Sequence, residues 1–222
     1  MVITIQDIQN TLKSWVGLSG VDADPSVRET HAKILFPNDN LSWALNYLSG
    51  WIDPHTGKKK FASTCALTTR SYLRTVWGLH TRELDLPYEH RVGTAFSDVK
   101  VIGQAYSSWT SDKDELAAVP DIGDSVEVGD DAGGGMYHVL NVLDYNSDNG
   151  AIISVDGGQV EGVHITTRER ILIAPSNKPF DRGVWLVDPV TPYKPDGSPN
   201  GRIVSGKVSA KKLAAKLGFE LI

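Results

Sequence analysis

The chain has 222 residues, of which 41% are hydrophobic, and it carries a formal net charge of −5 at pH 7 with a single cysteine. This length and apolar content predict one large domain, or one domain with an appendage, that folds unaided. The negative charge, with no basic block longer than Lys58–Lys60, argues against binding to nucleic acid, and one cysteine excludes an intrachain disulfide framework.

Neither a Sec signal nor a membrane span is visible in the sequence. The first residues, Met1–Gln9, lack a basic n-region, an apolar h-region and a small-residue cleavage site, and no run of 18 consecutive apolar residues occurs. We therefore expect a protein that is made in the cytoplasm without a Sec signal and that does not span a membrane.

The N-terminal part of the chain predicts about four helices. Apolar residues recur at helical spacing from Ile5 to Trp15, and residues 25–35 and 41–48 predict two further helices, separated by turn-forming residues at 37–40. A fourth helix is expected to begin near Cys65, after Ser63 and Thr64, which are good N-cap residues.

From residue 125 onward, short apolar runs alternate with turns. They predict strands at 125–128, 138–143, 151–155, 170–173 and 183–187, with 144–150 as a hairpin loop. Between the two halves, residues 99–102 predict a strand and residues 112–119 a short helix, and the turn-rich segment 188–201 leads to a basic helix over 209–217. Helices first and an antiparallel sheet after them indicate an α+β fold.

Cys65 is the first candidate for a catalytic residue. Its predicted position in the first turn of a helix places the thiol near unpaired backbone N–H groups and the positive end of the helix dipole. These groups favour thiolate over thiol, as a nucleophile requires. The alternative is a structural cysteine that serves as a small buried apolar side chain.

His138 is the candidate general base. It opens a predicted strand directly after the glycine-rich stretch 133–135, where the backbone can bend sharply. If the Cys65 helix packs across the sheet, the imidazole can come within about 3–4 Å of the sulfur and take its proton. The alternative is a hydrogen-bonded structural histidine.

The order of these motifs resembles that of NlpC-type peptidases and CHAP amidases, which are papain-like cysteine hydrolases of the cell wall. Residues 117–128 are similar to their "P-G-D-L-V-F" strand, residues 138–143 to their "H-V-G-I-Y/V" strand, and residues 150–159 to the next strand, which carries the third catalytic residue. The resemblance covers about residues 60–187. It implies a papain-like α+β fold with N-terminal helices followed by an antiparallel β-sheet.

Under this resemblance the chain divides into three regions within one globular unit. Residues 1–60 form an N-terminal helical region, residues 61–190 the papain-like catalytic core, and residues 191–222 a C-terminal extension. The cysteine motif departs from the NlpC pattern, since Thr64-Cys65-Ala66-Leu67 replaces "D-C-S-G-F-V" and the upstream "Y-x-W-G-G" is absent.

The residues that depart from the NlpC pattern resemble those of a second group of proteins. Thr-Cys-Ala-Leu before a helix resembles the peptidoglycan amidase effectors of type VI secretion. This resemblance implies a secretion apparatus and a cognate immunity protein as partners, and injection into a target periplasm without a Sec signal. A phage lysin released by a holin would share these features.

Asp156 is the preferred third catalytic residue. It would accept a hydrogen bond from the far ring nitrogen of His138 and so fix its tautomer. Ser154 and Gln159 are the alternatives, Asp124 is a further candidate, and Asp156-Gly157-Gly158 could equally be a simple turn. The oxyanion hole would use the Cys65 backbone N–H and a second donor that the sequence does not identify.

We expect no metal and no cofactor. The six histidines show no His-x-x-x-His or Cys/His spacing, and the glycine runs at 133–135 and 157–158 are not followed by the Gly-Lys-Ser/Thr of a phosphate loop.

The sequence therefore predicts a cysteine peptidase or amidase in which Cys65, His138 and Asp156 cleave an amide bond of peptidoglycan, as an antibacterial secreted effector. Three alternatives remain open. They are a deamidase or acyltransferase acting on a host protein, a phage lysin, and a non-enzymatic module with a degenerate site.

Overall fold

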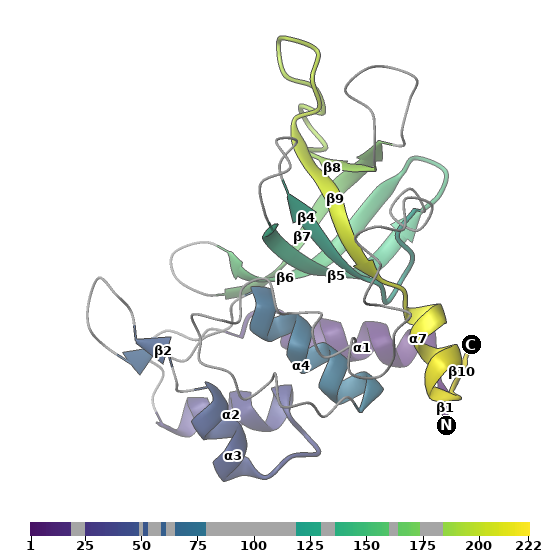
Figure 1. Cartoon of the computed structure of the whole chain (residues 1–222). Coiled ribbons are helices and arrows are strands. Elements are labelled where there is room, and N and C mark those ends of the chain that lie inside the picture. The colour runs from purple at the N-terminus through teal and green to yellow at the C-terminus, as the bar shows by residue number, and fades with distance from the viewer. Residues whose placement is uncertain are drawn as a thin grey trace.

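The computed structural model describes residues 1–18, 25–48, 51–52, 59–60, 65–78, 119–129, 136–159, 164–173 and 184–222. In this part of the chain, a layer of helices lies beneath a β-barrel (Figure 1). The strand predicted at 99–102 and all but the last residue of the helix predicted at 112–119 lie outside the described residues.

The helices follow the predicted periodicity. Their bounds are α1 (Ile5–Trp15), α2 (Pro25–Leu35), α3 (Leu41–Leu48), α4 (Cys65–Trp77) and α7 (Ala210–Leu217). In α1, Thr4 and Asp7 form a reciprocal capping box, and Ile8, Leu12 and Trp15 are buried. Ser209 caps the start of α7. The five helices that the sequence predicted in these regions are confirmed.

Six antiparallel strands form the barrel, in sequence order around its wall. They are β4 (Ser125–Gly129), β5 (Met136–Asn146), β6 (Ala151–Gln159), β7 (His164–Ile173), β8 (Trp185–Val187) and β9 (Gly201–Val208). The hairpin loop predicted at 144–150 joins β5 to β6, but it is shorter than predicted because residues 144–146 belong to β5. Two short pairs complete the described strands: β1 (Val2–Ile3) is parallel to β10 (Glu220–Leu221), and β2 (Trp51–Ile52) is antiparallel to β3 (Lys59–Lys60).

The predicted fold class, a papain-like α+β arrangement of N-terminal helices followed by an antiparallel β-sheet, is wrong. The strands close into a six-stranded barrel, because β9 pairs with β8 on one side and with β4 on the other. Ser125 lies opposite Val208 across this closure. The strand that closes the barrel comes from the segment that the sequence presented as a C-terminal extension.

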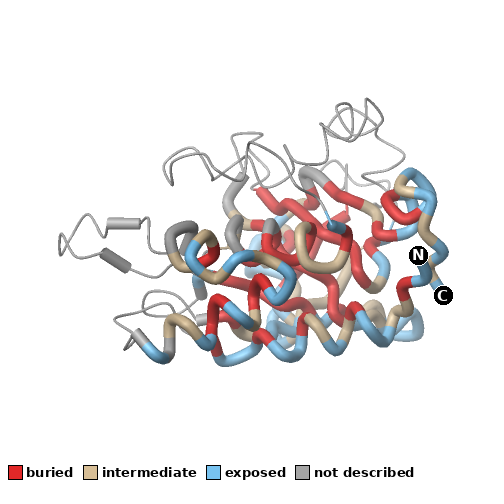
Figure 2. Tube along the Cα trace, turned by 90° about the horizontal axis from the view of Figure 1, so that it is seen from below, coloured by how far each residue is buried: buried red, intermediate tan, exposed pale blue. Residues whose placement is uncertain are grey.

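Side chains from alternate positions of the strands fill two separate apolar clusters. The inner cluster lies within the barrel and includes Val128, Leu140, Ile152 and Leu186. The outer cluster joins the barrel to the helices. It combines side chains of α1 and α4 with strand residues that alternate with those of the inner cluster, such as Val139, which precedes Leu140 in β5. Figure 2 shows that the buried residues gather in the interior of the described chain and that exposed residues lie toward its outside.

Polar contacts fix α4 between the barrel and the other helices. The Tyr72 hydroxyl donates to the Gly123 carbonyl at 2.6 Å, at the entrance to β4. Arg74 pairs with Asp39 through two nitrogens, at 2.7 and 2.5 Å, and its guanidinium lies 4.2 Å from the centre of a Trp43 ring. Since α4 is held at its centre and end, the position of its first residue, Cys65, is set relative to the barrel.

At Gly201, β9 packs closely against β8 where the barrel closes. A Cβ at this position would lie 2.1 Å from the Leu186 carbonyl oxygen and 2.6 Å from the Val187 Cα. Both atoms belong to backbone, so Gly201→Ala is expected to lower the free energy of unfolding by about 2 kcal/mol or more. Denaturant unfolding followed by circular dichroism measures the change.

Gly197→Ala is the matched control. Gly197 has a φ of +81°, but a Cβ at this position would meet no atom within 4 Å, so the substitution costs only backbone strain of about 1 kcal/mol. An equal or smaller loss at Gly201 than at Gly197 would contradict the close approach of the two strands.

Candidate active site

Cys65 is the first residue of α4 and is half-buried. The helix packs against β5 and β6, as the nucleophile hypothesis required. The Cys65 side chain hydrogen-bonds the imidazole of His138. The predicted capping residues Ser63 and Thr64 lie outside the described residues.

His138 is the third residue of β5 and its side chain is 14% exposed. Its Nε2 lies 2.9 Å from Oδ2 of Asp156. With Nε2 occupied by the carboxylate, Nδ1 is the ring nitrogen available to the Cys65 sulfur. The structure therefore brings the three predicted residues into one hydrogen-bonded chain, from α4 through β5 to β6.

Asp156 is fully buried, and both of its carboxylate oxygens are engaged. Oδ2 accepts from His138 and, at 2.5 Å, from Nη2 of Arg170 on β7. Oδ1 accepts from the Ser154 hydroxyl at 2.6 Å and from Nη1 of Arg170 at 3.4 Å. The Arg170 guanidinium also donates to Ser154. A buried carboxylate with this many donors is held in one orientation.

The charges of these groups shift their pKa values in opposite directions. Burial alone would lower the pKa of His138, but the hydrogen bonds and charges of Asp156 and Cys65 outweigh it and raise the pKa to about 9. Burial alone would raise the pKa of Asp156, but His138 and Arg170 lower it to about 2. At neutral pH the site therefore contains an imidazolium and a carboxylate.

The other candidates for the third position have different surroundings. Ser154 is buried and donates to Asp156, so it supports the carboxylate. Asp124 accepts from the backbone N–H groups of Asp121 and Ala210, which ties the start of β4 to α7, and burial raises its pKa to about 6. The side chain of Gln159 lies outside the described part of the structure. The catalytic roles of Cys65, His138 and Asp156 stay predictions.

Arg170 is the member of the cluster that sequence reasoning missed. It was assigned only to a strand, as the first residue of the predicted segment 170–173. The available signal was the alternation of Thr166, Arg168 and Arg170 along β7, because residues two apart on a strand share a face. That signal identifies a polar face but not its partner, which depends on the pairing of β7 with β6.

Among the described residues, no group of three or more His, Cys, Asp or Glu side chains is placed to hold a metal ion. The polar cluster of the candidate active site is instead completed by the guanidinium of Arg170.

Within the described ranges, no helix has the length and apolar character needed to cross a membrane.

Comparisons with models of protein families, with curated proteins and with solved structures found no match.

His138 is expected to titrate near pH 9 instead of near 6.5. Asp156→Asn removes one of the two groups that raise this pKa and leaves burial and Cys65 in place, so the midpoint should fall clearly below that of the wild type. Imidazole resonances followed by NMR against pH measure both midpoints. Since the folded pKa is the higher one, the stability due to protonated His138 is full below about pH 6.5 and lost as the pH rises through about 9.

Asp196→Asn is the control for that titration, because Asp196 is an exposed carboxylate in the turn before β9. It should leave the His138 midpoint unchanged. A wild-type midpoint near 6.5, or the same midpoint in Asp156→Asn as in the wild type, would contradict the interaction.

Arg170→Met should destabilise the protein by about 1–3 kcal/mol at pH 7, because it removes one of the two cationic partners of the buried Asp156 carboxylate and leaves only His138. The pKa of Asp156 is lowered in the folded protein, so its contribution to stability is present above about pH 4 and is lost as the pH falls toward 2. The difference in free energy of unfolding between wild type and variant should therefore narrow over that range in denaturant titrations.

Arg168→Met is the matched control for Arg170→Met. Arg168 lies on the same face of β7 but is exposed, and it makes no side-chain hydrogen bond or ion pair with the described residues. This variant should change stability by less than about 0.5 kcal/mol. Equal losses in the two variants would exclude a specific role of Arg170 in holding Asp156.

Proposed function

We propose that this protein is a cysteine hydrolase that cleaves an amide bond. The observation that carries the proposal is the hydrogen-bonded chain from Cys65 through His138 to Asp156. A thiol at the start of a helix, an imidazole with a raised pKa and a buried carboxylate behind the imidazole form an arrangement suited to nucleophilic catalysis.

Each residue has a separate role in the proposed reaction. The protonated His138 favours the thiolate of Cys65, which attacks the carbonyl carbon of the amide. His138 then gives its proton to the leaving amine as the C–N bond breaks, which leaves a thioester on Cys65. His138 next takes a proton from water, which attacks the thioester, and the acid product departs as the C–S bond breaks, which restores the Cys65 thiolate and the protonated His138. Asp156 keeps the imidazole oriented throughout.

The proposed substrate is peptidoglycan, cleaved by amidase or endopeptidase activity. Support comes from the order of motifs around Cys65, His138 and Asp156, which resembles that of cell-wall cysteine hydrolases. We further propose an antibacterial effector that is secreted or injected and acts in the periplasm of a target cell, with an immunity protein as a partner.

The direct test is digestion of purified peptidoglycan with mass spectrometry of the released muropeptides. The wild type should release products whose masses identify the cleaved amide, and Cys65→Ala should release none while its melting temperature stays nearly unchanged. Iodoacetamide should alkylate Cys65 at pH ~6 far faster than it alkylates free cysteine, whose pKa is ~8.5. His138→Ala serves as the control and should reduce this rate toward that of free cysteine.

Other outcomes would assign other functions. Full hydrolysis by Cys65→Ala would end the nucleophile hypothesis. Fast alkylation without wall products, together with Gln-to-Glu conversion or acyl transfer in a host protein, would indicate the deamidase or acyltransferase alternative. Slow alkylation and intact walls would favour a non-enzymatic module.

A further inference from the structure

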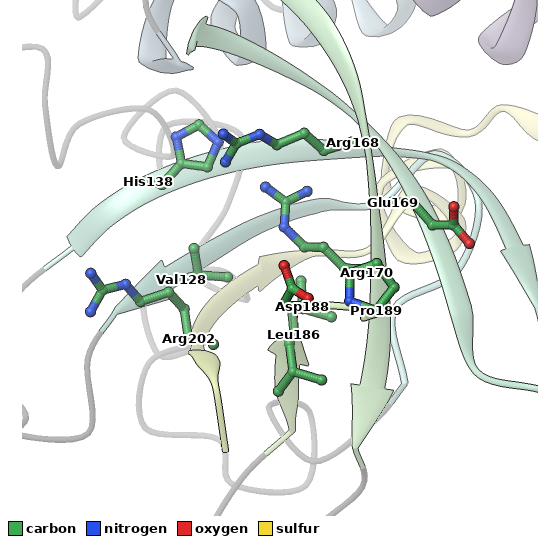
Figure 3. A pocket seen from close by; sticks show the side chains of 11 residues that line it. Val128, His138, Arg168, Glu169, Arg170, Leu186, Asp188, Pro189 and Arg202 are labelled. Atoms are coloured by element: carbon green, nitrogen blue, oxygen red, sulfur yellow. The ribbon is translucent and has the colours of Figure 1, made fainter. Parts of the chain in front are cut away.

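A cavity of about 590 Å³ lies next to His138. Its walls come from β4, β5, β7, β8 and β9, and they combine apolar side chains of the inner cluster, such as Val128 and Leu186, with charged ones. Figure 3 shows His138 on one wall of this cavity, with Arg168 and Arg170 extending from β7 toward the strand that carries it. Because His138 also contacts Cys65, a molecule bound in this cavity would be separated from the Cys65 sulfur only by the His138 side chain.

Three arginines line the cavity, and they share the inner face of the barrel. Arg168 and Arg170 lie four and two residues before Leu172, which packs on the inner cluster. Arg202 lies opposite Leu186 in the pairing of β8 with β9, so it occupies the same face. The strand register therefore directs these cationic side chains to one side of the sheet.

The arginines differ in what they contact. Arg170 is committed to Asp156 and Ser154. Arg168 is exposed, and its side chain has no hydrogen-bond or ion-pair partner among the described residues. Arg168 thus presents a planar set of donors at the cavity, which is the geometry that binds a carboxylate through two parallel hydrogen bonds.

Two acidic residues also border the cavity, but neither neutralises Arg168. Glu169 lies between Arg168 and Arg170 in the sequence, so it faces the other side of β7, and Figure 3 shows its carboxylate pointing away from them. Asp188 accepts hydrogen bonds from the backbone N–H groups of Val190 and Thr191, both at 2.8 Å, which tie it to its own turn.

We propose that this cavity is a carboxylate-binding subsite, in which Arg168, assisted by Arg202, holds an anionic group of the substrate beside His138. This inference rests on the proposed function, because it assigns the substrate group that binds next to the amide bond cleaved by Cys65. Peptidoglycan stem peptides carry free carboxylates close to their amide bonds, so they offer the group that Arg168 would bind.

The test compares binding of two probes to the Cys65→Ala protein, so that no probe is consumed. One probe is a soluble stem peptide with free carboxylates, and the other is the same peptide with its carboxylates converted to carboxamides. Calorimetric titration should show the carboxylate form binding about 10-fold to 100-fold more tightly, the range expected for hydrogen bonds between charged groups. Adding Arg168→Gln should remove this preference.

Lys211→Gln, added to Cys65→Ala, is the matched control, because it removes one positive charge from the exposed face of α7. It should keep the preference, which separates a local contact from a general effect of net charge. Equal affinity for the two probes, no binding of either probe, or an unchanged preference in the Arg168→Gln variant would overturn the proposal.

Failure of this inference and failure of the proposed function give different results. Wall hydrolysis by the wild type with no preference between the probes would leave the hydrolase and remove the subsite. A preference that depends on Arg168, in a protein whose wild type releases no muropeptides, would leave the subsite and remove the wall hydrolase.

Discussion

The buried carboxylate of Asp156 imposes the strictest constraint on this structure. An ionised group without contact to water costs several kcal/mol unless charged or polar partners surround it. Its partners come from three adjacent strands: His138 on β5, Ser154 on β6 and Arg170 on β7. A shift of one residue in either pairing would turn a partner to the opposite face, so the register of the barrel and the geometry of the site depend on each other.

The polar cluster around Asp156 lies where the two apolar clusters meet. The inner cluster fills part of the barrel, and the outer cluster fixes α4 against β5 and β6. His138 lies where these two regions meet, and it contacts Cys65 from the helix layer and Asp156 from the barrel. The helix layer therefore supplies the proposed nucleophile, and the barrel supplies the proposed base and its orienting acid. In the proposed function, the arginines of the cavity extend the same polar face toward the substrate.

Local sequence patterns predicted much of the secondary structure. Helices α1 to α4 begin and end close to the predicted residues, because helical periodicity, capping residues and breakers act within a few positions of the chain. The position of Cys65 at a helix start followed from the same signals. The strands β4 to β8 were also recognised as short apolar runs, although β7 begins six residues before its predicted start, at His164.

The sequence by itself thus determined where the local elements lie and which side chains could carry cysteine chemistry. It left Asp156, Ser154 and Gln159 open as the third residue, and it did not indicate that β9 closes a barrel or that Arg170 holds the carboxylate. Only the tertiary structure decided that the Asp156 carboxylate lies next to His138, that β9 closes the barrel and that Arg170 pairs with Asp156. Each depends on contacts between segments far apart in the chain, such as Ser125 with Val208, and the free energy of those contacts arises only when the strands pair.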